Sequence, residues 1–360
     1  MNSRVHYIDN LRTSTVSLLI IYHIAMAYNT WGEANYIFFG SVKPVASIVV
    51  FISPWFMPFM FLLAGIGAFY SLNKRNCASF IKERLIRLGI PLIFGLLFLN
   101  PILSYIADVT HNGFSGNYLE HYRIYFTRVT DLSGYDGGFT LGHLWFIAVL
   151  IMISIFSCGI IKMLPKSPPS KSRIVIIAVL IAAGIATFDV KFFGKPLITY
   201  ICIYLLGYYF FSNQELIKRL TRYKWIFASV FLLASIMNVL LFVFIGQYEW
   251  LNNICNYLSF ISGIPALLCL GREYLNAANR FSRACSRLSY VFYIIHFPIV
   301  VLCQYFVSLS GIGIIPNLAI SFVISAIMTS VLCLLIDTNA ITRILFGIKK
   351  NKDNQDMVLK

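Results

Sequence analysis

The stretch VASIVVFISPWFMPFMFLLAGIGAFY occupies residues 45–70 and contains no Asp, Glu, Lys or Arg. A membrane-spanning helix needs about 20 consecutive apolar residues, so this stretch predicts a membrane span. It also contains Pro54 and Pro58, and each proline lacks a backbone N–H donor. We therefore expect this span to be kinked or broken near its middle.

The rest of the chain has the same apolar character. Of its 360 residues, 59% are hydrophobic and 12% are charged, whereas soluble domains average about 45–50% apolar and about 25% charged residues. This composition excludes a disordered protein, a coiled coil and a typical cytosolic enzyme. It predicts an all-α, polytopic integral membrane protein with about ten transmembrane helices. The apolar stretches lie at 11–29, 45–70, 88–107, 143–161, 174–188, 196–212, 225–246, 252–270, 288–308 and 312–336.

The basic residues indicate how the chain is oriented. The net charge is +15, and with ten spans 24 of the 29 Lys and Arg residues fall on the side that holds both termini. Cytoplasmic segments of membrane proteins carry the excess of Lys and Arg, so both termini are expected in the cytoplasm and the chain in the plasma or inner membrane. Topology and contact with anionic lipid explain the charge, and no nucleic-acid partner is expected. The outer side holds Lys43, Arg123, Arg128, Lys191 and Lys195.

The predicted domain organisation is simple. Residues 1–340 are expected to form one transmembrane domain, and residues 341–360 a basic and polar cytoplasmic tail. The first apolar stretch is interpreted as a span and not as a cleaved signal peptide, because it contains Arg12 and stays apolar past the small residues that resemble a cleavage site. The longest connection, 108–142 on the outer side, has a length typical of functional or disordered loops. The segment 166–171 is interpreted as a linker.

Arg12 and His23 share the first span. Ionisable side chains are costly at membrane depth and are functional candidates there. Eleven residues at about 100° per residue return a helix to nearly the same face, so both side chains are expected on one stripe, about 16 Å apart along the axis. Apolar surroundings hold an imidazole in its neutral form, which a general base needs. A histidine packed against a neighbouring Ser or carbonyl is the alternative, and the shared stripe favours function.

Two further histidines lie in apolar spans. His296 belongs to the segment YIIHFP that starts at Tyr293, and its proline frees backbone carbonyls in a way that suits a polar pocket. His143 and Trp145 belong to the segment GHLWF that opens the fourth span at the outer surface. For both histidines, a role in the chemistry and a purely structural role as a packing or anchoring side chain stay open.

Arg84 and Arg87 lie one helical turn apart at the cytoplasmic end of the third span and present two guanidinium groups on one helix face. Such groups suit phosphate oxygens, but on charge alone a helix anchor at the cytoplasmic surface is the better interpretation. The eight cysteines are scattered without a CxxC pair and are interpreted as packing residues. The sequence has no P-loop, GxGxxG, HExxH or metal-spaced His/Cys cluster, so neither a metal nor a permanently bound cofactor is expected.

The order and spacing of these segments resemble those of the membrane acyltransferase-3 family. The segment IDNLR, which contains Asp9 and ends at Arg12, is followed by ten residues and then His23, and this arrangement is similar to the opening signature of that family. The segment FLLAG at 61–65 resembles its second-span pattern, although Ala64 stands where Ser is common.

The later segments fit the same resemblance. Arg84-x-x-Arg87, followed by Ile-Pro, is similar to the cytoplasmic RxxR element of the family. The segments GHLWF and YIIHFP resemble the branch that contains glucan-modifying, succinyltransferase-like members. The resemblance covers about residues 5–340, and no fused periplasmic hydrolase-like domain is expected, which disfavours a two-step transfer through a soluble module.

The resemblance implies an acyl-CoA-dependent O-acyltransferase that transfers groups other than amino-acyl groups. It would move an acetyl or succinyl group from cytoplasmic acyl-CoA, its donor substrate, to a hydroxyl of an extracytoplasmic carbohydrate or glycolipid. His23 would be the catalytic base or a transient acyl carrier, and Arg12 would orient the site or hold the donor. Arg84 and Arg87 would bind the CoA phosphates. Acceptor-binding or supporting roles would fall to His143, Trp145, Tyr293, His296 and Asp9.

Two other functions stay open from the sequence. An exporter or transporter of a glycan or small molecule, without acyl transfer, would share the proline-containing second span and the polar midline. An acyltransferase that modifies lipid in the cytoplasmic leaflet would label lipid instead of glycan. The sequence makes no prediction of the oligomeric state.

Overall fold

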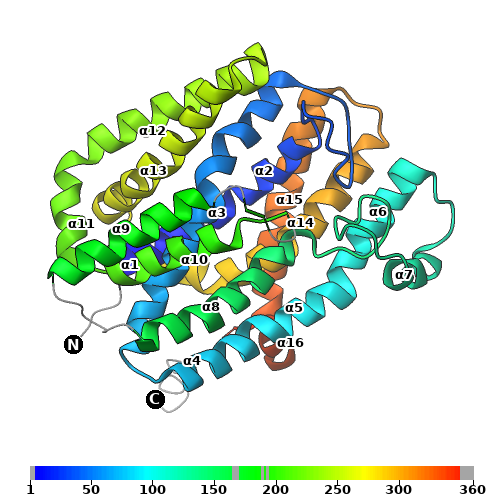
Figure 1. Cartoon of the computed structure of the whole chain (residues 1–360). Coiled ribbons are helices and arrows are strands. Elements are labelled where there is room, and N and C mark those ends of the chain that lie inside the picture. The colour runs from blue at the N-terminus through cyan, green and yellow to red at the C-terminus, as the bar shows by residue number, and fades with distance from the viewer. Residues whose placement is uncertain (1–4, 164–169, 188–189, 192–193, 349–360) are drawn as a thin grey trace.

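The computed structural model describes residues 5–163, 170–187, 190–191 and 194–348. All regular elements within these residues are helical, and no strand is among them (Figure 1). Seven helical segments of this part of the chain are long and apolar enough to cross a membrane. They are Lys43–Leu72, Cys77–Asn112, Gly142–Met163, Gln214–Ile245, Glu249–Tyr274, Arg280–Ser308 and Ile314–Ile336.

The remaining predicted spans fall on shorter helices. Two of them coincide with the shorter apolar helices Val175–Gly184 and Leu197–Phe211. The stretch predicted at 11–29 coincides with the helices α1 (His6–Ser17) and α2 (Leu19–Met26). The structure thus gives an all-helical protein with seven candidate spans, while the count of ten and the cytoplasmic position of both termini stay predictions.

The helices α1 and α2 form one nearly continuous rod. Leu18 separates them, but its N–H bonds to the carbonyl of Ser14 at 3.3 Å and its own carbonyl accepts the N–H of Tyr22 at 3.0 Å. The helical spacing between Arg12 and His23 is therefore close to the one that the sequence predicts.

The helix α3 (Lys43–Leu72) runs unbroken through both of its prolines. Pro54 cannot donate to the carbonyl of Val50, which lies four residues earlier. The Nδ2 of Asn238, on a helix distant in sequence, donates to that carbonyl at 3.3 Å. A neighbouring helix therefore satisfies the freed backbone group. Of the expected kink or break, the break is wrong and the kink stays a prediction.

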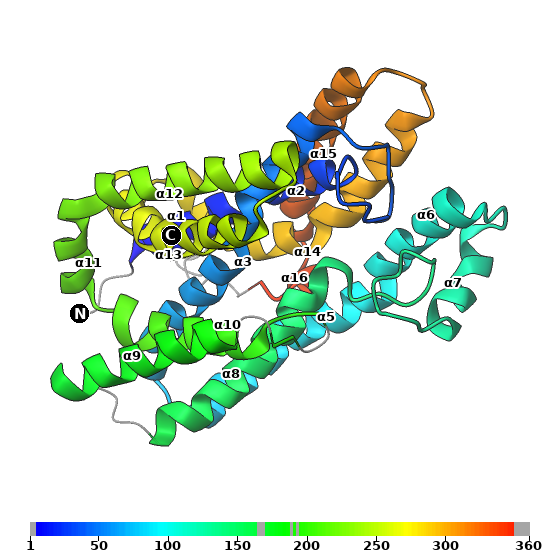
Figure 2. The ribbon, with the colours of Figure 1, turned by 45° about the horizontal axis from the view of Figure 1, so that its top comes forward.

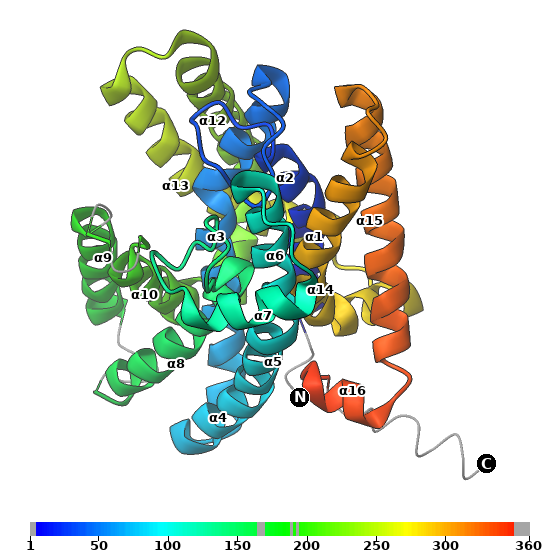
Figure 3. The same cartoon turned by 90° about the vertical axis from the view of Figure 1, so that its right-hand side faces the viewer.

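The helical segment Cys77–Asn112 contains two π-helical turns. It joins α4 (Cys77–Arg84), η1 (Leu85–Gly89), α5 (Ile90–Phe94), η2 (Gly95–Leu99) and α6 (Asn100–Asn112), and both η segments are π-helical. The short helix α7 (Tyr118–Thr127) lies across one end of the bundle (Figure 3). Its Tyr122 and Tyr125 hydroxyls donate to the carbonyls of Leu97 and Leu96 at 2.8 and 3.0 Å.

The second half of the chain completes the bundle in pairs of neighbours. The helix α12 packs along α13, α14 along α15, and α10 against α3 and α9, and Figure 2 shows these groups fanning out around α3. The elements are η3 (Gly142–Leu144), α8 (Trp145–Met163), α9 (Ser170–Ala186), α10 (Leu197–Leu206), η4 (Gly207–Phe211), α11 (Gln214–Leu220), η5 (Thr221–Tyr223), α12 (Lys224–Val239), η6 (Leu240–Ile245), α13 (Glu249–Tyr274), α14 (Arg280–Ser308), α15 (Ile314–Ile336) and α16 (Ala340–Leu345).

Two glycines allow α3 to approach the α10–η4 helix closely. A Cβ atom on Gly65 would overlap the backbone carbonyl of Tyr204, and one on Gly207 would overlap the carbonyl of Leu62. Small residues at such crossings let helix backbones pack together inside a membrane. The crossing holds α10, which carries Tyr200, against the centre of the bundle.

The predicted linker and the predicted C-terminal tail both lie partly outside the described residues. The linker predicted at 166–171 falls mainly outside them, and its last two residues begin α9. The tail predicted from residue 341 begins within α16, and Phe346 is buried in the main core. The residues from 349 onward lie outside the description.

Candidate active site

A cavity of about 490 Å³ opens between the helices α2, α3, α10 and α14 and the segments that connect them. Its inner wall includes His23 on α2, His143 in η3 and Phe297 on α14. Its outer wall comes from the 27–42 connection and from the 108–142 loop that the sequence predicts on the outer side. The cavity therefore extends from the predicted interior of the membrane to the predicted outer surface.

His23 is the histidine of this cavity that is partly exposed. Its ring stacks on Phe297, with centroids 3.9 Å apart and planes inclined at 27°. Tyr22 meets the same imidazole edge-on at 5.3 Å. Aromatic side chains thus hold the ring by its face and edge, and the described residues do not fix which of its nitrogens carries the proton.

His143 is held by the carbonyl that a proline leaves free. Pro298 removes the N–H that would bond the carbonyl of Ile294 in α14. The Nε2 of His143 lies 2.8 Å from that carbonyl oxygen. Because a carbonyl only accepts, Nε2 carries the proton in this bond, and the neutral ring has its lone pair on Nδ1. This buried Nδ1 has no hydrogen-bond partner among the described residues.

His296 has the opposite tautomer. Its Nδ1 lies 2.7 Å from the carbonyl oxygen of Tyr293 and 3.2 Å from that of Phe292. The proton is therefore on Nδ1, and the lone pair is on Nε2, which has no partner within the described part of the chain. The side chain is fully buried, at 0% exposure, and is not part of the cavity wall.

The three imidazoles form one cluster. The ring centroid of His296 lies 5.3 Å from that of His23 and 5.2 Å from that of His143. Backbone carbonyls fix the orientation of two of the rings, whereas the third ring faces the cavity. No group of three or more His, Cys, Asp and Glu residues that could hold a metal ion occurs among the described residues. The arrangement suits proton transfer at His23, supported by two buried neutral rings.

Tyr293 and Trp145, which the resemblance also assigns to the site, both line the cavity. The hydroxyl of Tyr293 donates to the backbone carbonyl of His143, so it helps to fix η3. Trp145 stacks against Tyr200 of α10, with centroids 6.2 Å apart and planes at 26°. These rings give one side of the cavity an aromatic surface of the kind that packs against the apolar face of a sugar ring.

The outer wall is polar and internally bonded. Glu33 accepts hydrogen bonds from the Tyr135 hydroxyl at 2.6 Å and from the Trp31 indole at 3.0 Å. Burial is the main cause that raises the pKa of Tyr135, and this keeps its hydroxyl protonated as a donor. Asp131 accepts from the hydroxyl and backbone N–H of Ser133, and these bonds hold the pKa of Asp131 below its usual value.

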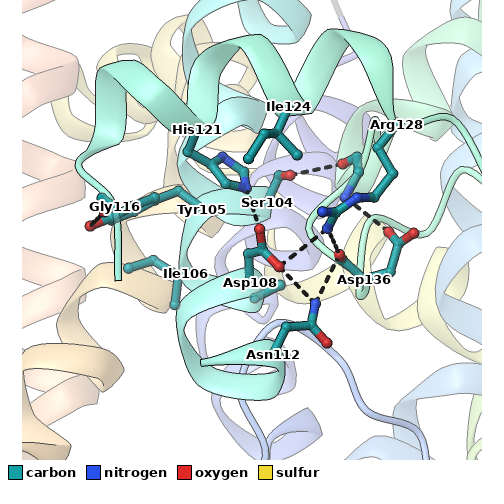
Figure 4. Close-up of polar contacts among 12 residues, drawn as sticks. Ser104, Tyr105, Ile106, Asp108, Asn112, Gly116, His121, Ile124, Arg128 and Asp136 are labelled. Atoms are coloured by element: carbon teal, nitrogen blue, oxygen red, sulfur yellow. Dashed lines mark hydrogen bonds and ion pairs between the residues drawn. The ribbon is translucent and has the colours of Figure 1, made fainter. Parts of the chain in front are cut away.

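A buried charge network fixes the loop that forms this wall (Figure 4). Asp108, at the end of α6, accepts from Asn112 at 2.7 Å and from Arg128 at 3.2 Å. Arg128 and Asn112 also donate to the backbone carbonyl of Asp136. The Nε2 of His121 lies 3.2 Å from the second carboxylate oxygen of Asp108, but outside the angular range of a hydrogen bond. The network positions the 128–141 segment over the cavity.

Arg12 and Asp9 lie elsewhere. Their side chains form an ion pair at 3.3 Å, and neither belongs to the cavity wall. A guanidinium nitrogen of Arg12 lies 3.7 Å from where a Cβ of Gly67 would be, near the end of α3. The structure therefore does not bring Arg12 and His23 together. They lie on the same α1–α2 rod, but only His23 lines the cavity.

Arg84 and Arg87 also lie away from the cavity. The guanidinium of Arg84 lies over the ring of Phe80, 5.0 Å from its centroid. Glu83 pairs with Arg87 at 3.4 Å and also with Arg75. Arg75 thus adds a third guanidinium to the predicted pair. Burial lowers its pKa, and the charges of Arg84 and Arg87 add to that effect.

The sequence interpretation missed several residues of the cavity. The sequence singles out Lys195 only for its charge and does not single out Glu33. Tyr22 donates to the hydroxyl of Ser53 at 3.2 Å, since Ser53 donates its own proton to the carbonyl of Val49. The Ser-Pro pair within an apolar span was the signal that could have indicated a polar contact at Ser53.

Comparisons with known proteins confirm the family resemblance of the sequence. A family model described as "Acyltransferase domain" matches residues 5–338. A curated relative, the glucans biosynthesis protein C of Salmonella gallinarum (strain 287/91 / NCTC 13346), is 26% identical over 172 residues. That match covers 45% of this chain and 40% of the relative, so the chain spans less than half of the relative's length. No solved structure matches the chain.

Proposed function

We propose that this chain, which belongs to the membrane acyltransferase-3 family, moves an acetyl or succinyl group from cytoplasmic acyl-CoA to a hydroxyl of an extracytoplasmic carbohydrate or glycolipid. The observation that carries the proposal is the partly exposed imidazole of His23, which faces the cavity beside His143 and the buried His296, two rings that backbone carbonyls fix. The printed name of the distant relative, a glucans biosynthesis protein, supports a carbohydrate acceptor.

The chemistry at His23 is a proton transfer coupled to acyl transfer. The acceptor hydroxyl oxygen attacks the thioester carbonyl carbon while a neutral His23 nitrogen takes the hydroxyl proton. The carbon–sulfur bond then breaks, and the CoA sulfur leaves with the proton from the imidazolium. In the alternative order, a neutral His23 nitrogen attacks the thioester carbonyl carbon and the CoA sulfur leaves as a thiolate. The acceptor hydroxyl then attacks the acyl-imidazole, its proton goes to the thiolate, and His23 is released neutral. The stacked Phe297 holds the ring in place in both orders.

The donor would bind at the opposite end of the bundle. CoA is polyanionic, and the charges of Arg84 and Arg87 lie close enough to act on Arg75 there. Guanidinium groups suit phosphate oxygens. We propose that these residues hold the CoA phosphates on the cytoplasmic side of the inner membrane, while the flexible arm of CoA carries the thioester toward His23.

The proposal is tested with purified protein in lipid nanodiscs and labelled acyl-CoA. His23→Ala should abolish transfer to envelope glycan while the protein keeps its fold, as judged by its helical circular dichroism. An acyl-histidine intermediate predicts labelled protein when acceptor is absent, whereas direct transfer predicts none. Movement of glycan across vesicles without acyl-CoA turnover would instead identify a transporter, and labelled lipid would identify a lipid acyltransferase.

A second set of variants tests the donor site. The double variant Arg84→Gln and Arg87→Gln should weaken CoA binding by about tenfold or more, the effect of losing charge-assisted hydrogen bonds, with little change in acceptor affinity. Arg219→Gln, on the exposed face of α11, is the control. Equal loss of donor and acceptor affinity would contradict a phosphate-binding role.

A further inference from the structure

Lys195 places a positive charge in the wall of the His23 cavity. The residue precedes α10 and lies among the residues that line this space. Its ammonium group lies 4.6 Å from the centroid of the Trp145 ring. The same indole stacks against Tyr200, so the ammonium stands at the edge of the aromatic surface that would face a sugar ring.

The two carboxylates in the wall of this cavity, Glu33 and Asp131, already have other partners. Glu33 accepts from Tyr135 and Trp31, one bond at each carboxylate oxygen. Asp131 accepts two bonds from Ser133. No ion pair joins Lys195 to a carboxylate within the residues that the structure describes, although Glu33 is close enough to stabilise its charge.

Lys195 is half-buried, and this makes its charge less favourable without an anionic partner. Burial is the largest influence on the ammonium and lowers the pKa of Lys195, and the positive charge of Lys191 acts in the same direction. A cation–π contact compensates only part of the lost hydration. Buried charges are normally paired, so an anion that enters the cavity would gain a strong contact here.

We propose that Lys195 binds a carboxylate or phosphate group of the substrate in the His23 cavity and makes the enzyme selective for an anionic substrate. The inference rests on the proposed function, because it assigns the cavity to the reacting molecules. The anionic group belongs either to the acyl group, as the free carboxylate of a dicarboxylic acid, or to the carbohydrate acceptor. Lys195 then selects and positions the substrate beside His23 without taking part in the proton transfer.

The test compares Lys195→Gln with Lys195→Arg in lipid nanodiscs. Lys191→Gln is the matched control, because Lys191 is an exposed lysine of the same connection and is not part of the cavity wall. Transfer is measured from acetyl-CoA and from succinyl-CoA to envelope glycans that anion exchange has separated into neutral and anionic fractions. Lys195→Gln should lower kcat/KM for the anionic substrate by about tenfold or more, the effect of one lost charge-assisted hydrogen bond. Lys195→Arg and Lys191→Gln should retain most of it.

The pattern of loss identifies the source of the anion. Loss with succinyl-CoA but not acetyl-CoA, whichever glycan is used, places the anion on the acyl group. Loss with anionic glycans but not neutral ones, whichever donor is used, places it on the acceptor. Two results overturn the proposal for Lys195→Gln. One is a rate within about twofold of wild type for all four combinations of donor and glycan fraction, and the other is an equal loss for all four combinations.

A binding measurement separates this proposal from the proposed function. Lys195 in the wild-type protein is labelled with a small amine-reactive reagent, and the modified peptide is quantified by mass spectrometry. Succinate and inorganic phosphate should protect Lys195 but not Lys191, and glucose should protect neither. Protection without any acyl transfer would mean that the enzyme assignment fails and the anion site stands. Equal labelling with and without the anions would overturn the anion site even in an active enzyme.

Discussion

His121 makes the stability of the outer loop, with its Asp108 charge network, depend on pH. Burial is the main cause that lowers the pKa of His121, and Asp108 only partly offsets it. In the unfolded chain, His121 would bind a proton at the ordinary histidine pKa of about 6.5. In the folded protein, His121 binds a proton only at lower pH. The unfolded state therefore binds more protons below that pH, and stability is lost as the pH falls.

We expect the unfolding temperature to fall between about pH 7 and pH 5, and His121→Gln to reduce this dependence. The measurement is thermal unfolding in detergent micelles across that range. Replacing His111, whose ring bonds the carbonyl of Asn35 at 3.0 Å, is the control. A pH dependence that is unchanged in the His121 variant would contradict the assignment.

The sequence could identify the histidines of the site but not their relations. His23, His143 and His296 lie in spans where ionisable groups are rare, and this made them candidates. The pairing of His143 with the carbonyl of Ile294 depends on the packing of η3 against α14, 151 residues apart. Lys195 could not be recognised, because only the folded chain places it over Trp145.

At the scale of elements, Pro298 in α14 controls the position of His143. In Pro298→Ala, the new N–H can bond the carbonyl of Ile294 and compete with His143. We expect unchanged or slightly higher stability, with acyl transfer lower by about tenfold to a hundredfold because the His143 ring loses the contact that orients it, although Tyr293 still bonds the His143 carbonyl. Pro265→Ala in α13 is the control, since Pro265 also lies inside a helix but not at the cavity. Equal activity of both variants and wild type would show that the His143 contact is dispensable.

The close crossing of α3 and the α10–η4 helix gives a prediction about stability. Gly65→Ala puts a methyl group against the carbonyl of Tyr204, and overpacking of this kind costs about 1–3 kcal/mol of unfolding free energy. Gly159→Ala on α8 has nothing within 4 Å of the new atom and should be neutral or stabilising. Denaturant unfolding in micelles measures both, and equal stability of the two variants would contradict the crossing.

Apolar composition predicts the existence of the long helices well, because about 20 apolar residues are needed to cross a bilayer. The continuity of α3 was not predictable from its own residues. It depends on Asn238, which lies 188 residues away and satisfies the carbonyl that Pro54 leaves free. The π-helical turns η1 and η2 likewise lack a recognisable local signal.

At the scale of the whole molecule, the excess of basic residues on one side predicts the orientation. Leu119 on α7 is 80% exposed and Met163 at the end of α8 is 86% exposed. In intact cells, a membrane-impermeant maleimide should label Leu119→Cys, and should label Met163→Cys only after permeabilisation. The wild-type protein with its native cysteines gives the background. Labelling of Met163→Cys in intact cells would contradict the predicted topology.

Mass spectrometry of envelope glycans is the direct test of the proposed transfer of an acyl group by His23 to an extracytoplasmic carbohydrate. Glycans are compared from cells that express no copy of the protein, the wild type, or His23→Ala at equal membrane abundance. Glycan from wild-type cells should carry an added acyl mass that is absent from the other two samples. Glycan spectra that are identical in all three, or an acyl adduct that persists with His23→Ala, would contradict it.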